Sequence, residues 1–291
     1  EALAVLEHLA ALQGVDGGFE ARYTAAGTVP DDRPAQLDGT GWVMWAAGRV
    51  LGAARPDAAR VDADRPDAAR VDGRLGVCLR RCASRLLELT GGPHRLPPVS
   101  PDYWEVAEGR LTLATAMSVL LGLEAAAALE REGIDLGPSA GRMAGRAAVV
   151  RLAMERAFAP DWGRHVRDEH VDAAIALVGP PFTQALSGAQ RVRADAVSRM
   201  RRESGGVAPG ESWRDDGVSW TPETALLAWS AAALGRSQEA EQLLGWLDEH
   251  RTAVGALAEK VGDDGAPAGP APLAWTCALV ILAAVDAGLS A

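Results

Sequence analysis

Residues 221–250 read TPETALLAWSAAALGRSQEAEQLLGWLDEH, and this stretch contains the pattern that decides the fold. It opens on Thr221, Pro222 and Glu223, which are a capping residue, a proline suited to the first helical position and an acid suited to the first turn. After a short connection at 235–236, a second segment gathers its apolar residues on one helical face: Ala240, Leu243, Leu244 and Leu247. The stretch therefore predicts two helices joined as a hairpin.

The same helical periodicity recurs along the chain, and no strand-like alternation competes with it. The pattern predicts helices at 1–13, 36–54, 71–89, 112–132, 138–158, 171–178, 188–203, 221–234, 237–250 and 272–289. Two segments, Thr112–Leu129 and Pro272–Val285, are apolar on all sides, so we expect both to be buried. The second segment is too short to span a bilayer, and no secretory leader is visible.

Long and short connections alternate between these helices. In stacked helical hairpins alternate connections emerge at the same end, so the long loops should gather on one face, where long loops are usually functional. We therefore expect an all-α fold, an α/α toroid spanning 1–291 with its site built by loops. The long connections are 14–35, 90–111, 159–170, 204–220 and 251–271, and the short ones are 133–137, 179–187 and 235–236.

Composition narrows the classes of function. The chain has 291 residues, a net charge of −10 and 48% hydrophobic residues, which excludes disorder as its main state and disfavours a nucleic-acid or anionic-membrane partner. Its 3 cysteines exclude a disulfide scaffold and predict a cytoplasmic location. Because 1–13 is already helical in pattern without a preceding cap, we expect the chain to be a fragment of a longer polypeptide.

For several local patterns the sequence predicts a structural role and no catalytic or binding function. The octapeptide Arg55–Asp62 recurs as Arg65–Asp72, which predicts a loop insertion at 55–74 without a function. The G-x-S-x-G pattern around Ser139 follows a predicted helix rather than the strand that a hydrolase elbow needs, so Ser139 is expected to cap a helix. Cys78 and Cys82 are expected to be buried thiols, and no metal site is predicted.

Two glutamates in long loops are the candidate acid and base. Glu105 lies in the stretch PDYWEV at 101–106, where apolar neighbours would raise its pKa and make it a proton donor. Glu259 precedes Lys260, the chain's sole lysine, which could keep a base ionised. Tryptophan dominates the aromatic residues, with 9 Trp against 3 Phe and 2 Tyr, and its broad face stacks well on sugars.

Several stretches in order resemble the glucoamylase-like glycoside hydrolases of family 15. The segment Gln36-Leu37-Asp38-Gly39, followed by Trp42, resembles the family's opening of an inner helix. Trp104-Glu105 resembles its general-acid motif, and the stretch from Gly255 to Lys260 with Trp275 resembles its general-base segment. Trp220-Thr221-Pro222 resembles the start of another inner helix. The ordered set covers nearly the whole chain.

The resemblance implies a six-hairpin α/α barrel that lacks its first helix or helices. It implies inverting hydrolysis of an α-glucosidic bond in an oligosaccharide or disaccharide, with no cofactor. Glu105 would be the general acid and Glu259 the general base, and an inverting pair stands roughly 6.5–9.5 Å apart. The residues that would line the site are Asp38, Trp42, Trp104, Trp220 and Trp275.

This sequence also departs from the family. The Trp-Pro-Arg-Asp segment that grips the cleaved sugar would precede Glu1, and the arginine expected before Trp220 is best matched by Arg214. A second interpretation is therefore a non-catalytic carbohydrate-binding or regulatory α/α toroid. A third is a terpene-cyclase-like toroid, faintly suggested by the stretch from Leu12 to Phe19 but lacking the acidic motif.

Overall fold

The computed structural model describes residues 1–52, 71 and 73–289, which form two compact units, Glu1–Ala157 (unit 1) and Phe158–Ala291 (unit 2). The single toroidal domain expected over 1–291 stays a prediction. The predicted insertion at 55–74 lies outside the described residues, apart from Val71 and the first two residues of the next helix.

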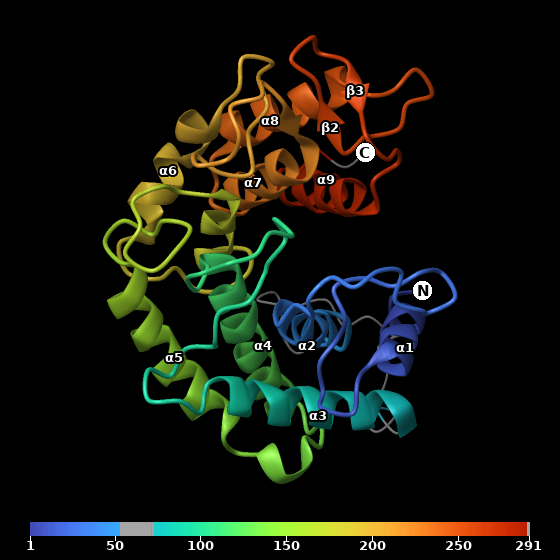
Figure 1. Ribbon diagram of the computed structural model, residues 1–291, viewed down its shortest axis with the longest axis vertical. Coiled ribbons are helices and arrows are strands. Elements are labelled where there is room, and N and C mark those ends of the chain that lie inside the picture. Colours follow the sequence, from blue (N-terminus) through green and yellow to red (C-terminus); the bar gives the residue numbers. More distant parts are fainter. Residues whose placement is uncertain (53–70, 72, 290–291) are drawn as a thin grey trace. The chain divides into compact units, whose positions relative to one another are not determined.

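The chain is predominantly helical, and each predicted helix has a counterpart (Figure 1). Unit 1 contains α1 (Ala2–Leu12), α2 (Asp38–Val50), α3 (Gly73–Leu89), α4 (Leu113–Arg131), the short 3-10 helix η2 (Gly137–Ser139) and α5 (Met143–Phe158), whose last residue belongs to unit 2. Unit 2 contains the 3-10 helix η3 (Ala173–Val178), α6 (Ala189–Met200), β1 (Ser219–Trp220), α7 (Thr221–Ala233), α8 (Ser237–Glu249), β2 (Lys260–Val261), β3 (Pro267–Ala268) and α9 (Ala274–Asp286).

Helix α4 forms the core of unit 1, because its residues are apolar on every side. Thr112 caps it by accepting a hydrogen bond from the backbone of Thr115 at 3.2 Å. By length and hydropathy α4 is the one helix in the described part of the chain that could cross a membrane. In this structure 89% of its apolar window is buried inside the protein.

Two glycines let α2 approach α4 at backbone distance. A Cβ on Gly41 would stand 2.1 Å from the carbonyl oxygen of Ser118, and a Cβ on Gly122 would stand 2.8 Å from the Cα of Gly41. Close packing of this kind fixes the position of the first turn of α2, which begins at Asp38. The helix start that carries the Gln-Leu-Asp-Gly motif is therefore tied to the core of unit 1.

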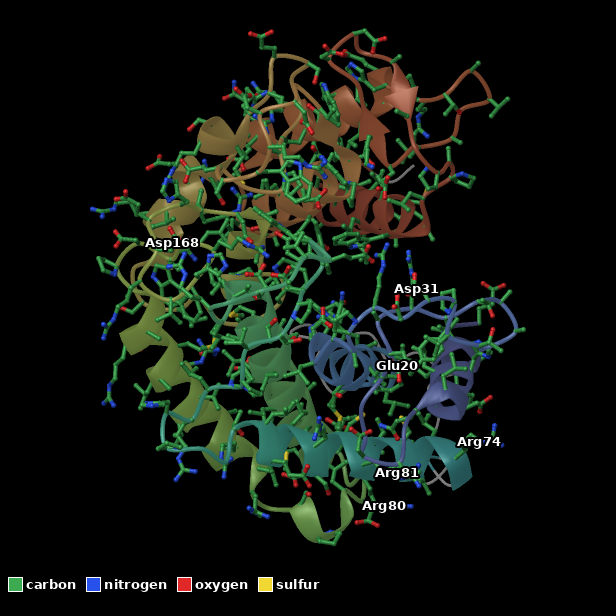
Figure 2. All side chains as sticks on the ribbon, in the orientation of Figure 1. Glu20, Asp31, Arg74, Arg80, Arg81 and Asp168 are labelled. Atoms are coloured by element: carbon green, nitrogen blue, oxygen red, sulfur yellow. The ribbon has the colours of Figure 1, made fainter. Side chains whose placement is uncertain are left out.

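Helix α3 covers this core with one apolar face. Leu79 and Leu86 are fully buried, while the side chains of Arg74, Arg80 and Arg81 extend to the surface (Figure 2). The two thiols expected to be buried, Cys78 and Cys82, are free and buried on the inner face, which confirms that prediction. The amide Nε2 of Gln13 donates to the Sγ of Cys82 at 3.1 Å and so joins the end of α1 to α3.

The segment around Ser139 differs from the expectation. Ser139 ends the 3-10 helix η2, its hydroxyl lies 3.1 Å from that of Ser84, and α5 begins later, at Met143. Ser139 is buried and does not cap α5. A helix and a turn precede it, so the strand-to-helix geometry of a nucleophile elbow is not formed.

Helix α7 is the buried centre of unit 2. Its first eleven residues, Thr221–Ala231, are all buried, and η3, α8 and α9 pack around it. Its N-terminus adjoins a small antiparallel sheet in the order β1-β2-β3, in which Trp220 pairs with Lys260. Sequence periodicity missed this sheet because each strand is two residues long, too short for an alternating pattern to appear.

The hydroxyl of Thr221 joins three segments of unit 2. It donates to the carbonyl oxygen of Ala258 at 2.6 Å and lies 2.8 Å from the hydroxyl of Thr276 in the first turn of α9. The backbone N–H of Thr221 donates to the carbonyl oxygen of Glu259 at 3.0 Å, and the N–H of Glu259 donates to that of Pro270 at 3.0 Å. The backbone around Glu259 is therefore held from both sides.

Helix α9 does not have the burial that its composition predicts. Thr276, Leu279 and Ala283 are buried, whereas Ile281 and Val285 are 64% and 55% exposed. Within the described residues, α7 and α8 contact α9 and cover one face of it. The expectation that Pro272–Val285 is buried on all sides is therefore wrong, because burial depends on how many neighbours surround a helix as well as on its own residues.

We predict that Gly41→Ala lowers the free energy of unfolding by about 3 kcal/mol, because the new methyl group meets backbone atoms of α4 that cannot move aside. Urea denaturation measures the effect. Gly145→Ala in the exposed face of α5 is the control, since its Cβ would meet no described atom within 4 Å, and it should stabilise by about 0.5–1 kcal/mol. Equal effects of the two substitutions would contradict the close contact.

We predict that Thr221→Val destabilises the protein by about 1–3 kcal/mol, because the buried carbonyl of Ala258 loses its donor while the side-chain volume is preserved. Denaturation with urea measures this change, and Thr28→Val, at an exposed position, is the control. Proteolysis should also open the loop at 251–271 sooner in Thr221→Val. An unchanged cleavage rate in that loop would argue against the role of the hydroxyl.

Candidate functional site

The two long loops of unit 1 meet, as the alternation of connections predicts. The amide Nε2 of Gln36 donates to the carbonyl oxygen of Asp102 at 3.1 Å, and the N–H of Leu37 donates to the hydroxyl of Ser100 at 3.1 Å. The guanidinium of Arg33 forms an ion pair with Glu105. The segments that carry the Gln-Leu-Asp-Gly and Trp-Glu motifs therefore lie side by side.

Asp38 is the most perturbed carboxyl of this cluster. Burial, and after it the charge of Asp102, raise the pKa of Asp38 to about 6, although a hydrogen bond from Trp42 to its carboxylate acts in the opposite direction. Asp102 is fully buried and accepts the N–H of Trp104 at 2.9 Å. Three of the residues expected to line a site, Asp38, Trp42 and Trp104, are thus connected within unit 1.

Glu105 occupies different surroundings from those expected. Its side chain is 42% exposed and contacts the Arg33 guanidinium, so the predicted apolar environment is not present. The backbone of Glu105 has a φ of +56°, in the left-handed region that non-glycine residues seldom adopt. Its N–H closes a turn by donating to the carbonyl oxygen of Asp102 at 2.8 Å, and this turn directs the side chain outward. Outliers of this kind cluster at functional sites.

The second candidate glutamate, Glu259, has the neighbours that the sequence predicts. The Nζ of Lys260 lies 3.0 Å from the Oε2 of Glu259 and 4.3 Å from the centroid of the Trp220 ring. All three side chains are half-buried. The ammonium therefore forms an ion pair with a carboxylate and a cation–π contact with an indole, and the two contacts restrict its position.

Aromatic residues continue from Trp220 along the preceding loop. The ring of Trp213 meets that of Trp220 edge-on at 5.5 Å, and the guanidinium of Arg214 stacks 5.0 Å over Trp213. Trp275 is 41% exposed in the first turn of α9, next to the Thr276 that contacts Thr221. Trp213 was not predicted as a site residue, although its place in a long loop beside Arg214 was a signal that could have found it.

Glu223 is the functional candidate that sequence reasoning missed, because its position in the first turn of α7 was explained by the helix dipole. Its side chain is 3% exposed, and its Oε2 has no hydrogen-bond partner among the described residues. Burial, together with the smaller effects of the charges of Glu259 and Asp172, raises the pKa of Glu223 to about 8. Asp172 is itself buried, in an ion pair with Arg164 at 2.8 Å.

The predicted acid and base belong to different units. Glu105 lies in unit 1 and Glu259 in unit 2, and each is surrounded by its own cluster of site residues. Their approach to an inverting separation stays a prediction. Asp38, Trp42 and Trp104 belong to the first cluster, and Trp220 and Trp275 to the second.

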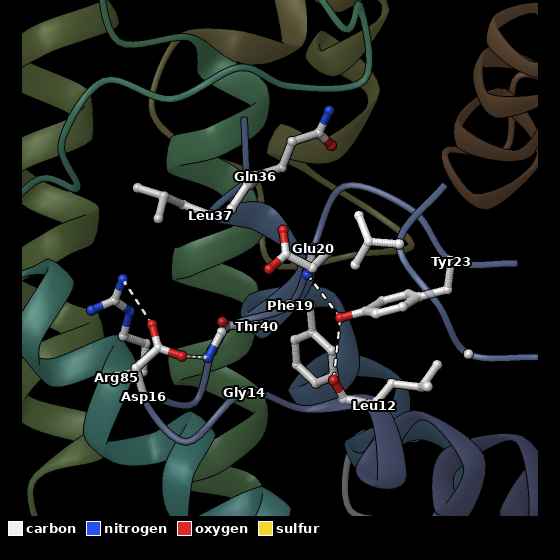
Figure 3. A pocket seen from close by; sticks show the side chains of 14 residues that line it. Leu12, Gly14, Asp16, Phe19, Glu20, Tyr23, Gln36, Leu37, Thr40 and Arg85 are labelled. Carbon is white, nitrogen blue, oxygen red and sulfur yellow. Dashed lines mark hydrogen bonds and ion pairs between the residues drawn. The ribbon is translucent and has the colours of Figure 1, made fainter. Parts of the chain in front are cut away.

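Unit 1 also contains a pocket of about 350 Å³ beside the start of α2 (Figure 3). Gln36 and Leu37 form part of its wall, and Phe19 lies across from them. Asp16 contacts Arg85 at 3.6 Å, and the hydroxyl of Tyr23 accepts the N–H of Glu20 at 2.8 Å. Its size falls within the range of small-molecule sites, but most of its polar groups already bind one another.

Metal-ligating side chains do not converge in the described part of the chain: no group of three or more His, Cys, Asp and Glu has a geometry that could hold an ion. The imidazoles of His165 and His170 each lie within hydrogen-bond distance of Asp168, at 3.1 Å and 3.0 Å. This arrangement orders the loop before η3.

Comparison with known proteins identifies the fold. No protein-family model and no curated protein sequence matches the chain. Among solved structures it is similar to a glycosidase, with a TM-score of 0.73 and 22% identity over 100% of this chain and 81% of that one. A bacterial glucoamylase complexed with acarbose matches with a TM-score of 0.68 and 16% identity over 97% of this chain and 45% of the glucoamylase. A cellobiose 2-epimerase from Spirochaeta thermophila DSM 6192 follows at 0.54 and 16%, covering 99% and 78%. The chain thus shares the fold of these carbohydrate-active proteins.

Proposed function

We propose that this protein is a glycoside hydrolase of the glucoamylase-like family 15 that cleaves an α-glucosidic bond with inversion. The observation that carries the proposal is the group of Glu259, Lys260 and Trp220, in which a half-buried carboxylate is ion-paired beside an aromatic face. The likeness to a glycosidase, one of whose variants was solved in complex with glucose, supports a sugar substrate.

Glu259 is the general base in this proposal. A base that activates water must be ionised and must reach solvent, and the carboxylate of Glu259 has both an ammonium partner at 3.0 Å and a side-chain exposure of 26%. Its backbone is held by Thr221 and Pro270, so the carboxylate needs little reorganisation before reaction. Trp220 and Trp275 supply indole faces for the sugar ring.

Glu105 is the general acid. In this structure its carboxylate is paired with Arg33. A substrate that reaches Glu105 exchanges this contact for the glycosidic oxygen, and it excludes water from a side chain that is now exposed. Exclusion of water favours the protonated form that an acid needs. Asp38, Trp42 and Trp104, which belong to the same cluster of unit 1 as Glu105, then contact the sugar.

The substrate class is an α-linked glucose oligosaccharide or disaccharide, such as a maltooligosaccharide, an isomaltose-like sugar, dextran or trehalose. Family 15 chemistry needs no cofactor. The small number of cysteines, 3 in 291 residues, supports a cytoplasmic location as part of this proposal. The second candidate, a non-catalytic carbohydrate-binding toroid, is favoured by the exposure of Glu105, because that carboxylate is not yet in an acid's environment.

We predict that the protein releases β-glucose from at least one α-linked glucoside, and that Glu105→Gln and Glu259→Gln each lower kcat/KM by about 10²–10⁴-fold. Glu105→Gln should affect activated aryl glucosides least, because a good leaving group needs little protonation, whereas Glu259→Gln should affect all substrates alike. Proton NMR of the released anomer measures both rate and stereochemistry.

Glu241→Gln, which removes an exposed carboxylate from α8, is the matched control and should retain full activity. Release of the α-anomer would exclude inversion. Binding of maltooligosaccharides without any hydrolysis, by wild type and variants alike, would favour the non-catalytic toroid instead.

A further inference from the structure

The buried carboxyl of Glu223 has no place in the acid–base pair, yet it lies in the same part of unit 2 as Glu259. We propose that Glu223 is a positioning residue of this site: it remains a protonated carboxylic acid and thereby leaves the Lys260 ammonium to Glu259. The assignment rests on the proposed function for its effect on turnover, but the charge arrangement itself can be tested without a substrate.

Geometry places Glu223 against the Glu259 segment. Glu223 follows Thr221 by two residues, and Thr221 binds the carbonyl oxygens of both Ala258 and Glu259. Its side chain is 3% exposed, so its carboxyl group is removed from water. The Oε2 of Glu223 and the Nε1 of Trp220 are both buried and have no hydrogen-bond partner among the described residues. Burial without a partner makes a negative charge costly at this position.

The charged neighbours of Glu223 come from two sides. Asp172 precedes η3 and is paired with Arg164 in a fully buried contact at 2.8 Å. From the other side, Glu259 precedes β2 and Lys260 opens it, and these two side chains pair at 3.0 Å. Each of the two nearby carboxylates thus has its own cation, and no basic side chain in the described part of the chain pairs with Glu223.

A proton on Glu223 resolves this imbalance. An ionised Glu223 would compete with Glu259 for the Lys260 ammonium and would place a further negative charge beside Asp172. Burial and these two carboxylates together raise the pKa of Glu223 to about 8. At neutral pH the group is therefore an uncharged hydrogen-bond donor, and Glu259 keeps its cation.

The pH dependence of stability follows with a definite sign. The folded protein holds the Glu223 proton up to a pH of about 8, whereas the unfolded chain releases it near the ordinary value of 4.5. The folded state thus binds more protons between these limits, so the contribution of Glu223 to stability declines as the pH rises through that window. Glu223→Gln lacks this decline because its amide does not titrate.

The test uses the sole lysine of the chain as a reporter. Full-length protein labelled with ¹⁵N-lysine gives one side-chain Nζ resonance, from Lys260, whose chemical shift is followed from pH 5 to pH 11. In wild type we expect an inflection near pH 8 that arises from Glu223. Glu223→Gln should lose this inflection, and the control Glu241→Gln should keep it.

Two further measurements keep the assignment independent of folding and of activity. Glu223→Met, which is neutral and of similar length, serves as a second variant in case Glu223→Gln does not fold. It should also lose the inflection near pH 8. Where wild type hydrolyses an α-glucoside, the roughly tenfold decline of kcat/KM per pH unit above pH 8 should be weaker in Glu223→Gln. An inflection near pH 8 that persists in both variants, or that is missing from wild type, overturns the proposal. If the Glu223 titration is found as expected but the protein hydrolyses no α-glucoside, the proposed hydrolase function is refuted and the assignment of Glu223 stands.

Discussion

The hydroxyl of Thr221 is the contact on which the candidate site of unit 2 depends. One oxygen atom at the start of α7 binds the carbonyl of Ala258 and the hydroxyl of Thr276, and so ties a long loop and the last helix to the buried centre of the unit. Because a helix N-terminus has free N–H groups, the N–H of Thr221 can also bind Glu259. A loop of 21 residues, 251–271, thereby presents one carboxylate in a defined place.

Burial of charge is the second constraint, and it acts on the same few residues. The ion pair of Arg164 with Asp172 is fully buried, and Glu223, whose pKa is raised in part by the charge of Asp172, is buried without a basic partner in the described part of the chain. Removing three ionisable groups from water is costly unless each is paired or neutral. Neutralisation of Glu223 meets this condition with the least rearrangement, since it needs one proton and no new contact. A stability cost of this kind is common where residues serve a site rather than the fold.

Much of the fold could be predicted from the sequence because helix signals are local. The burial of α4 follows from its apolar composition and is found. Helix α7 begins at Thr221, as the Thr-Pro-Glu pattern predicts, but the expectation that Thr221 caps it is wrong. The cap position is Trp220, and the Thr221 hydroxyl donates to the carbonyl of Ala258 instead of accepting a helical N–H. The exposure of α9 could not be predicted, since it depends on which helices surround it. The three short strands were also missed, because two residues carry no periodicity.

In the candidate site, too, features that depend on local sequence could be predicted, and features that depend on distant segments could not. Lys260 adjoins Glu259 in the chain, so the sequence indicates that the two side chains could interact, and the structure forms this ion pair. Glu105 was assigned apolar surroundings from its sequence neighbours, whereas Arg33, 72 residues away in the chain, is its actual contact. Glu223 was read as a helix-start acid, and its burial arises from segments distant in sequence. A single sequence therefore predicts the surroundings of a side chain poorly when these surroundings come from segments distant in the chain.

The two candidate carboxylates, Glu259 and Glu105, are held in position to different degrees. Glu259 is held by backbone hydrogen bonds and an ion pair whose ammonium is itself restricted by Trp220. Glu105 is more exposed and is paired with an arginine that extends from another loop. A base must be ionised before the substrate arrives, and an acid must be protonated when the bond breaks, so preorganisation benefits the base most. In the proposed mechanism, the binding energy of the sugar displaces Arg33 and desolvates Glu105, which couples formation of the acid to the presence of a substrate.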